Sequence, residues 1–159
     1  MVKVLFVCLG NICRSPMAEG LFLKQVKEAG LSDKIEIDSC GTGAWHVGDK
    51  ADPRMRETAS RHGINLLSRA RKVEITDFRE FDYIIPMDNS NLMNLQRMAT
   101  HVPDIKAAII KMRYFDEGNE NADVPDPYYG GEQGFEDVFQ MLDRSCAALL
   151  AFIREQHEI

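Results

Sequence analysis

The stretch that decides the fold lies near the start of the 159-residue sequence and reads Val4-Leu5-Phe6-Val7-Cys8-Leu9-Gly10-Asn11-Ile12-Cys13-Arg14-Ser15-Pro16. Its first four residues are a continuous apolar run followed by a turn, which is typical of a strand buried on both faces. Ser15 is a residue type that caps helices, and Pro16 suits the first helical position, so a helix is predicted from there to Gly30. This strand, loop and helix predict the first unit of an α/β fold.

The rest of the chain continues the alternation. Further strands are predicted at Ile35–Asp38, Tyr83–Ile85 and Ala107–Ile110. Further helices are predicted from Asp52 to His62, from Asp88 to about Met98, and along an apolar stripe from Phe135 to Ile153. The pattern predicts a single domain over residues 1–159 with a three-layer, doubly wound α/β fold, in which helices cover both faces of a mostly parallel sheet. The alternation is lost between Arg113 and Gly134, and a loop of that length is usually functional or mobile.

Composition excludes several classes of protein. Hydrophobic residues make up 45% of the chain, which is enough for an ordinary core and argues against disorder. The 19 basic and 25 acidic residues give a net charge of −6, which argues against a general nucleic-acid binder. No apolar run approaches the ~18 residues that a membrane span needs, and the N-terminal apolar stretch is too short for a signal peptide. A cytoplasmic location is therefore expected.

Four cysteines are spread along the chain, at Cys8, Cys13, Cys40 and Cys146. Disulfide scaffolds are usually smaller and richer in cysteine, and the absence of a C-x2-C pair argues against a zinc site. These thiols are therefore either buried or chemically used. Cys40 and Cys146 are interpreted as buried fillers, and no metal or cofactor is expected.

The loop after the first strand is the first candidate site, because ligands of such sheets bind beyond the carboxyl ends of the strands. Six successive N–H groups, from Leu9 to Arg14, can turn inward and cradle an anion. Gly10 and Asn11 are residue types that tolerate the left-handed backbone such a loop requires. The helix that follows adds the positive end of its dipole, and Arg14 can donate two hydrogen bonds to a tetrahedral dianion.

Cys8 is expected at the base of this anion-binding loop. Helix N-termini and nearby cations favour the thiolate form of a cysteine, and the Ser15 hydroxyl can donate to the sulfur. A thiolate below a bound phosphate is placed for in-line attack on phosphorus. The loop amides also stabilise the charge that spreads over the phosphoryl oxygens during transfer.

Residues 7–19, VCLGNICRSPMAE, contain a C-x5-R-S motif and resemble the low-molecular-weight protein tyrosine phosphatases, with a GTGAW stretch that is similar to their bacterial members. A second match is Asp126-Pro127-Tyr128-Tyr129 in the late loop. The resemblance covers essentially the whole chain. It implies a four-stranded parallel sheet in the order 2-1-3-4.

The resemblance also implies a role for individual residues. A phosphotyrosine ester needs a general acid to protonate its leaving oxygen, and in the family a late Asp-Pro pair supplies it, here Asp126. By the same resemblance, Cys8 is the nucleophile and Arg14 binds the phosphate. Ser15 stabilises the thiolate, and Asn11 holds the loop conformation through hydrogen bonds of its side chain.

Four residues are expected to form the rim of the substrate pocket: Leu9, Trp45, Tyr128 and Tyr129. The two tyrosines resemble the aromatic wall that holds an aryl substrate in this family. Trp45 follows the second strand, and its alternative interpretation is that it merely covers the core.

Two residues of the phosphate-binding loop bear on regulation and specificity. In the family a second cysteine can form a reversible disulfide with the nucleophile, so Cys13 either protects Cys8 or simply packs beneath the loop. Relatives that prefer phosphoarginine resemble CTGNTCRS, with threonine at the position of Ile12. The isoleucine therefore favours phosphotyrosine.

The predicted function is hydrolysis of phosphotyrosine and aryl phosphate monoesters through a cysteinyl-phosphate. The implied partners are tyrosine-phosphorylated proteins, with a tyrosine kinase as one candidate, and inorganic phosphate is the product. Arsenate reductases share the fold and loop, but they need further cysteines, typically near residues 80–90, and none lies between Cys40 and Cys146. A non-catalytic phosphate-binding module is a second alternative, which would not need Cys8 or Asp126.

Charge is unevenly distributed along the chain. Six basic residues and a single acidic one lie between Arg54 and Lys72, whereas eight acidic and no basic residues lie between Asp116 and Asp137. Solvated helix and loop faces account for most of this asymmetry. A second interpretation is that the basic stretch contacts acidic residues that flank a phosphotyrosine.

Overall fold

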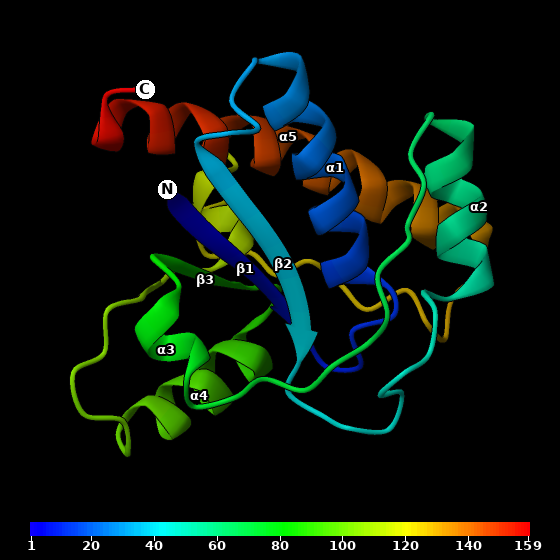
Figure 1. Ribbon diagram of the computed structural model, residues 1–159. Coiled ribbons are helices and arrows are strands. Elements are labelled where there is room, and N and C mark those ends of the chain that lie inside the picture. Colours follow the sequence, from blue (N-terminus) through cyan, green and yellow to red (C-terminus); the bar gives the residue numbers. More distant parts are fainter.

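A central four-stranded parallel sheet with helices on both faces organises the computed structural model, which describes residues 1–159 (Figure 1). The strands are β1 (Val2–Cys8), β2 (Ile35–Gly41), β3 (Tyr83–Pro86) and β4 (Ala108–Ile109). Their order in the sheet is β2-β1-β3-β4, and all three neighbouring pairs are parallel. The predicted α/β class and strand order are confirmed.

Six helical segments connect or follow these strands. They are α1 (Arg14–Glu28), α2 (Pro53–Arg61), α3 (Asp77–Glu80), α4 (Asn89–Ala99), the 3-10 turn η1 (Met112–Phe115) and α5 (Glu132–His157). The sequence analysis missed α3 and η1, because each has only four residues, too few to show a helical repeat of apolar positions. None of the helices is both long and apolar enough to cross a bilayer.

Strand β1 is the centre of the core, and its side chains alternate between two layers. Val4 and Phe6 belong to a large apolar cluster shared with α1 and α5, whereas Leu5 and Val7 belong to a smaller cluster on the opposite face. Figure 1 shows α1 and α5 over one face of the sheet and α3 and α4 over the other. Burial on both faces explains why this strand reads as an uninterrupted apolar run rather than an alternating one.

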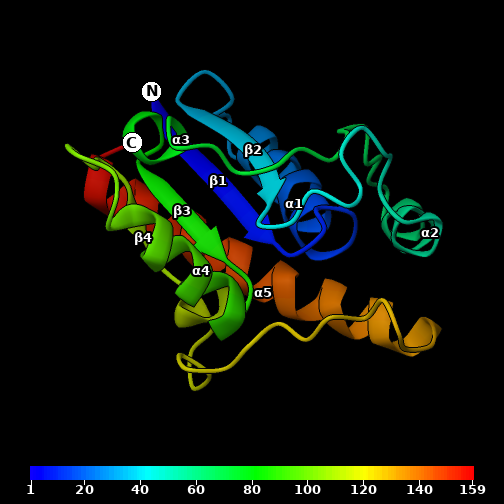
Figure 2. The same ribbon diagram turned by 90° about the horizontal axis from the view of Figure 1, so that it is seen from below.

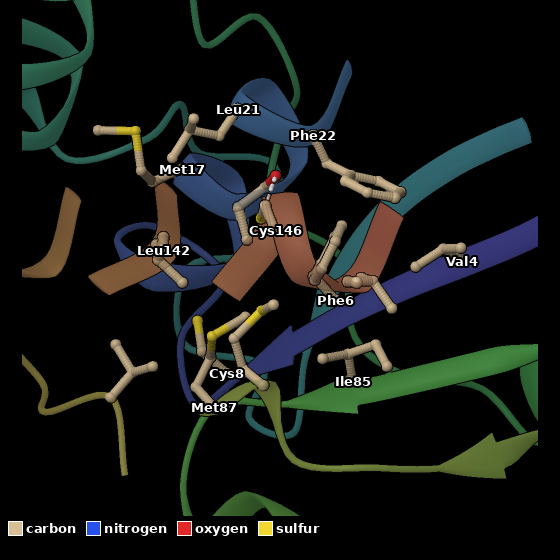
Figure 3. Packing of buried hydrophobic residues seen from close by; sticks show 14 of the residues in the cluster. Val4, Phe6, Cys8, Met17, Leu21, Phe22, Ile85, Met87, Leu142 and Cys146 are labelled. Atoms are coloured by element: carbon tan, nitrogen blue, oxygen red, sulfur yellow. Dashed lines mark hydrogen bonds between the residues drawn. The ribbon is translucent and has the colours of Figure 1, made fainter. Parts of the chain in front are cut away.

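The α1–α5 layer holds one of the two cysteines that were interpreted as fillers. Cys146 of α5 is fully buried beside the edge-to-face ring pair of Phe6 and Phe22, and its thiol donates to the Ala18 carbonyl over 3.9 Å (Figure 3). Cys40 is equally buried, in the cluster on the other face of the sheet. Burial raises the pKa of both thiols, so they remain neutral packing groups.

Two helices are capped by the residues at which the sequence predicts them to begin. The Asp52 carboxylate accepts the N–H of Arg54 over 2.8 Å and caps α2. The Asp88 carboxylate accepts the N–H of Asn91 over 2.8 Å and caps α4. Both carboxylates satisfy amides that would otherwise be unpaired in the first helical turn.

The predicted cap of α1 is wrong. The helix begins at Arg14, and Cys13 occupies the cap position without a side-chain hydrogen bond. Ser15 lies inside the first turn, where its hydroxyl is 3.0 Å from the sulfur of Cys8 and therefore serves the neighbouring loop instead. Pro16 is the third helical residue rather than the first, and its missing N–H still costs nothing within that turn.

The carboxyl ends of β1, β2 and β3 meet at one edge of the sheet (Figure 2). The chain passes from β1 to β2 on one side and then returns to β3 on the other, so β1 marks the point where the strand order reverses. The segment before α5 is tied to this edge by a hydrogen bond from Val124 N to Met87 O of 2.8 Å. Ligands of doubly wound folds bind at this type of edge.

We expect Phe22→Ala to lower the free energy of unfolding by about 3–5 kcal/mol, because it opens a cavity against Phe6 in the buried α1–α5 layer. Urea denaturation measures the change. The matched control is Leu23→Ala, the next residue of the same helix, whose side chain is 48% exposed and whose loss should cost no more than about 0.5 kcal/mol. Equal losses in the two variants would contradict this packing.

Candidate active site

The loop that joins β1 to α1 carries a series of unpaired backbone donors. None of the N–H groups from Leu9 to Ser15 donates to an acceptor within the protein. Buried or half-buried amides normally find acceptors, and successive unpaired amides at a helix N-terminus form a site for an anion. The geometry therefore has the donor set that the sequence predicts for a phosphate-binding loop.

Asn11 holds this loop in shape. Its backbone is left-handed, with φ of 56°. Gly10 was expected to be left-handed as well, but its φ is not positive. The Asn11 side chain donates to Ser15 Oγ over 2.8 Å and to Ser39 Oγ over 3.0 Å, and it accepts the N–H of Arg71 over 3.0 Å. One buried amide thus connects the loop to the first turn of α1, to β2 and to the segment after α2.

Two further contacts anchor the partners of Asn11. Ser39 donates to a Glu19 oxygen over 2.6 Å, and burial raises the pKa of Glu19 although that hydrogen bond acts in the opposite direction. The Arg71 guanidinium lies between the carboxylates of Asp38 and Asp77, at 3.0 Å from each. The sequence indicated no role for Ser39 or Glu19 and placed Arg71 only in the basic stretch, because nothing in local spacing indicates that the three residues meet beneath the loop.

Cys8 ends β1 and is only 3% exposed. Its sulfur lies 3.0 Å from Ser15 Oγ, and because Asn11 donates to that oxygen, the serine proton is available to the sulfur or to the Cys40 carbonyl at 3.3 Å. Burial, and then the Asp52 carboxylate, raise the pKa of the neighbouring Cys13 thiol well above its ordinary value. A hydroxyl donor beside the Cys8 sulfur can stabilise a thiolate there.

Arg14 places a buried guanidinium beside the same loop, with its side chain 3% exposed. One terminal nitrogen, Nη1, donates to Asp88 over 2.6 Å and to the Val124 carbonyl over 2.9 Å. Burial alone would lower the pKa of this guanidinium, but the negative charges of Cys8 and Asp88 outweigh it and raise the pKa. Arg14 is therefore a permanent cation whose orientation is fixed by Asp88, a residue that the sequence indicated only as the start of a helix.

Asp126 reaches the site from the segment before α5. Its Oδ2 lies 3.7 Å from Arg14 Nη2, and its Oδ1 accepts the N–H of Tyr128 over 3.0 Å. The side chain is 37% exposed, so the carboxyl group faces both the site and solvent. Asp126 is thus a turn residue, as Asp-Pro pairs often are, and at the same time a carboxyl group beside the buried arginine.

A pocket of about 370 Å³ brings most of the predicted site residues together. Cys8, Arg14 and Asp126 line it with the expected rim residues Leu9, Trp45, Tyr128 and Tyr129, and with Gly10, Ile12 and Cys13 of the loop. Asn11 and Ser15 are not in its wall but support it from behind. Cys8 is nearly inaccessible whereas Tyr129 is 92% exposed, so the pocket runs from an aromatic mouth to a thiol at its base.

The sequence matches the family described as low molecular weight phosphotyrosine protein phosphatase over residues 3–158. The chain belongs to this family. A curated phosphatase of Streptomyces coelicolor is 43% identical over 158 residues, which cover 98% of this chain and 96% of the relative. The prediction of a phosphatase of this family is confirmed.

Two solved structures extend the similarity to the fold. The crystal structure of an Entamoeba histolytica protein tyrosine phosphatase has a TM-score of 0.91 and 41% identity, with 99% of each chain covered. The crystal structure of a Drosophila arginine phosphatase also has a TM-score of 0.91, with 34% identity and 96% of this chain and 98% of that chain covered. The fold is therefore shared by relatives named for two different phosphorylated side chains.

His46 is a pocket residue of this phosphatase that sequence analysis missed. Its ring lies 6.3 Å from the ring of Tyr128, and its Nδ1 is 3.3 Å from an Asp49 oxygen. A side chain at Gly10 would place its Cβ 3.1 Å from His46 Cδ2, so the glycine favours close approach of the His46 ring rather than a left-handed backbone. The only signal in the sequence was the position of His46 directly after Trp45.

We expect Asn11→Gly to lower the free energy of unfolding of the phosphatase by about 2–4 kcal/mol, because two buried hydrogen bonds and one partly buried one are lost. Asn11→Ala should cost about 1 kcal/mol more, since alanine also pays for the left-handed backbone that glycine adopts freely. Urea denaturation of both variants measures the difference. Equal stabilities would mean that backbone strain at this position is negligible.

Proposed function

We propose that this phosphatase hydrolyses phosphotyrosine, and aryl phosphate monoesters in general, through a cysteinyl-phosphate formed on Cys8. The observation that carries the proposal is the convergence of four features on one pocket: the Cys8 sulfur, the unpaired loop amides, the Arg14 guanidinium and the Asp126 carboxyl group. Membership of the family supports the same chemistry.

In the first step the loop amides and Arg14 hold the phosphate group, with Nη2 of Arg14 free of the contacts that occupy Nη1. The Cys8 thiolate attacks phosphorus in line with the leaving oxygen, so that a sulfur–phosphorus bond forms as the phosphorus–oxygen bond breaks. Asp126 gives its proton to the departing phenolate. The Ser15 hydroxyl stabilises the thiolate before attack.

In the second step Asp126, now a carboxylate, takes a proton from a water molecule. The water oxygen attacks phosphorus, the sulfur–phosphorus bond breaks, and inorganic phosphate leaves with the Cys8 thiolate restored. The loop amides face the same phosphoryl oxygens in both steps, so the donors need no rearrangement between them.

The shape of the pocket favours an aryl substrate. Leu9, Ile12, Trp45, Tyr128 and Tyr129 provide an apolar and aromatic wall between the exposed mouth and the buried thiol. A phosphate on a tyrosine ring extends far enough to reach Cys8 at the base, and its ring fills the space along this wall. A phosphate on a short aliphatic side chain cannot fill the same space.

The proposed partners are tyrosine-phosphorylated proteins, with a tyrosine kinase as one candidate. A cytoplasmic location suits a mechanism that depends on a free thiol, because thiols persist in reducing compartments. We also propose that residues 1–159 act as one catalytic domain. The redox role of Cys13 stays a prediction.

We expect Cys8→Ser to abolish turnover of p-nitrophenyl phosphate, and Asp126→Ala to reduce kcat by about 10²–10⁴-fold. The loss in Asp126→Ala should be larger with phenyl phosphate than with p-nitrophenyl phosphate, because the poorer leaving group depends more on the acid. Rapid quench should reveal a burst in the wild type and, in Asp126→Ala, a trapped phosphoenzyme.

Two neighbouring variants serve as controls. Cys13→Ser changes the other loop thiol and should keep the burst, and Asp137→Asn changes an exposed carboxylate of α5 and should keep kcat. Wild-type turnover by Cys8→Ser would overturn the proposed nucleophile. Phosphotyrosine binding by the wild type without hydrolysis would favour a binding module instead.

Ile12 is expected to decide between phosphotyrosine and phosphoarginine. Its apolar side chain lines the pocket and suits an aryl ring, whereas a guanidinium group needs a hydrogen-bond acceptor. Ile12→Thr should therefore raise the ratio of phosphoarginine to phosphotyrosine turnover on the order of tenfold. Ile12→Val is the matched control, because valine has the shape of threonine without the hydroxyl, and an equal change in both variants would contradict the role of the hydroxyl.

A further inference from the structure

A second cavity, of about 450 Å³, adjoins the active-site pocket. Ile12, His46 and Tyr128 border both spaces, so the two are separated by side chains of the pocket wall rather than by a layer of the protein. A substrate whose phosphotyrosine enters the pocket therefore brings its neighbouring residues toward this second cavity. Each residue of an extended chain spans up to ~3.3–3.6 Å, so few residues are needed to reach it.

The far side of this cavity is formed by basic side chains. Lys50, Arg56 and Arg69 line it, and the same three residues also line the next hollow along the surface, of about 260 Å³. Lys50 and Arg69 are exposed, and Arg56 is half-buried. Positive charge thus extends along the surface away from the mouth of the active site.

These three cations are not neutralised by the protein. Arg56 Nε donates to the Ala51 carbonyl over 2.9 Å and Arg69 Nη1 donates to the Gly48 carbonyl over 3.0 Å, but neither residue, nor Lys50, forms an ion pair. Backbone carbonyls orient a guanidinium without cancelling its charge. The other donors of both arginines are therefore free for an anion.

Two carboxylates, Asp49 and Asp52, also line this cavity. Asp52 is paired with Arg54 at 3.0 Å, whereas Asp49 lies 3.3 Å from His46, whose ring offsets the charge of Asp49 only when it is protonated. Arg71, although it belongs to the same basic stretch of sequence, is held between two carboxylates beneath the loop. The structure thus distinguishes Arg54 and Arg71, which are paired with carboxylates, from the three unpaired cations that line the cavity.

The backbone brings two of the unpaired cations together. Lys50 and Arg69 are directly opposite each other in an antiparallel bridge, which is fixed by hydrogen bonds of 2.8 Å from Gly48 N to Ala70 O and from Ala70 N to Asp49 O. Like charges directly opposite each other across paired strands repel. A bound anion removes that repulsion, and an arginine can hold a carboxylate or phosphate with two parallel hydrogen bonds.

We propose that Lys50, Arg56 and Arg69 form a subsite for an anionic side chain, a carboxylate or a second phosphate, next to the phosphotyrosine in a polypeptide substrate. The subsite rests on the proposed function, because the phosphotyrosine in the pocket places the flanking residues. It identifies the preferred substrates as acidic or multiply phosphorylated segments.

The test measures kcat/KM for peptides with one phosphotyrosine in a neutral background, in which a single aspartate is moved through the three positions on either side. We expect a gain of about 3–10-fold at the positions that reach the subsite, and a gain that falls as salt is raised. Phosphoserine at the best position distinguishes a second phosphate from a carboxylate. The combined variant Lys50→Gln/Arg56→Gln/Arg69→Gln should lose the gain but keep the turnover of p-nitrophenyl phosphate within about twofold.

A control variant with the same change in net charge is Lys27→Gln/Lys34→Gln/Arg97→Gln, at exposed positions of the chain outside the cavity. It should keep the preference for acidic peptides. If the combined subsite variant is unstable, Arg56→Gln alone should still reduce the gain by about 2–3-fold.

An equal rate for acidic and neutral peptides in the wild type overturns the subsite, and so does a preference that survives in the subsite variant. In both cases hydrolysis of the neutral phosphotyrosine peptide persists, so the proposed function stands. Failure of the wild type to hydrolyse any phosphotyrosine peptide overturns both.

Discussion

The active site depends on one constraint: the amides from Leu9 to Ser15 must remain without internal acceptors while they converge on one pocket. Folded proteins normally satisfy such donors, so a loop with this many unpaired amides tends to collapse into a different set of hydrogen bonds. Asn11 prevents this, because its left-handed backbone turns the loop and its buried side chain forms hydrogen bonds with three partners. The loop amides thus stay without internal acceptors because the hydrogen bonds of the Asn11 side chain hold the loop in place.

The fold supplies the rigid partners that this arrangement needs. Strand β1 is central and buried on both faces, so Cys8 at its end is held by its pairing with Gly41 of β2 and by the pairing of the preceding Val7 with Pro86 of β3. The guanidinium of Arg71 fixes the third contact of Asn11 because two carboxylates, Asp38 and Asp77, hold it. A loop built on these elements can present its amides without the entropy cost of ordering them when an anion binds.

The resemblance to the family implied the sheet order and the role of Asp126. Sequence reasoning from local patterns reached the α/β class and the anion-binding loop, because a buried strand and the Cys8–Ser15 motif can be read directly from the sequence. It failed where a side chain serves a distant partner. Ser15 has the chemistry of a helix cap, yet its hydroxyl is taken by Cys8, and Asp88 caps a helix with one oxygen while it holds Arg14 with the other. These additional roles of Ser15 and Asp88 depend on contacts between residues far apart in the sequence, which the spacing of residues along the chain does not reveal.

Contacts between distant residues also explain how a chain with a net charge of −6 recognises anions. Total charge affects long-range attraction, whereas binding depends on which cations lack a carboxylate partner at the place where the anion sits. Arg71 and Arg54 contribute to the basic composition of their segment but are neutralised by Asp38, Asp77 and Asp52. The pairing observed in the fold separates these two arginines from Lys50, Arg56 and Arg69, which have no carboxylate partner and lie beside the active-site pocket.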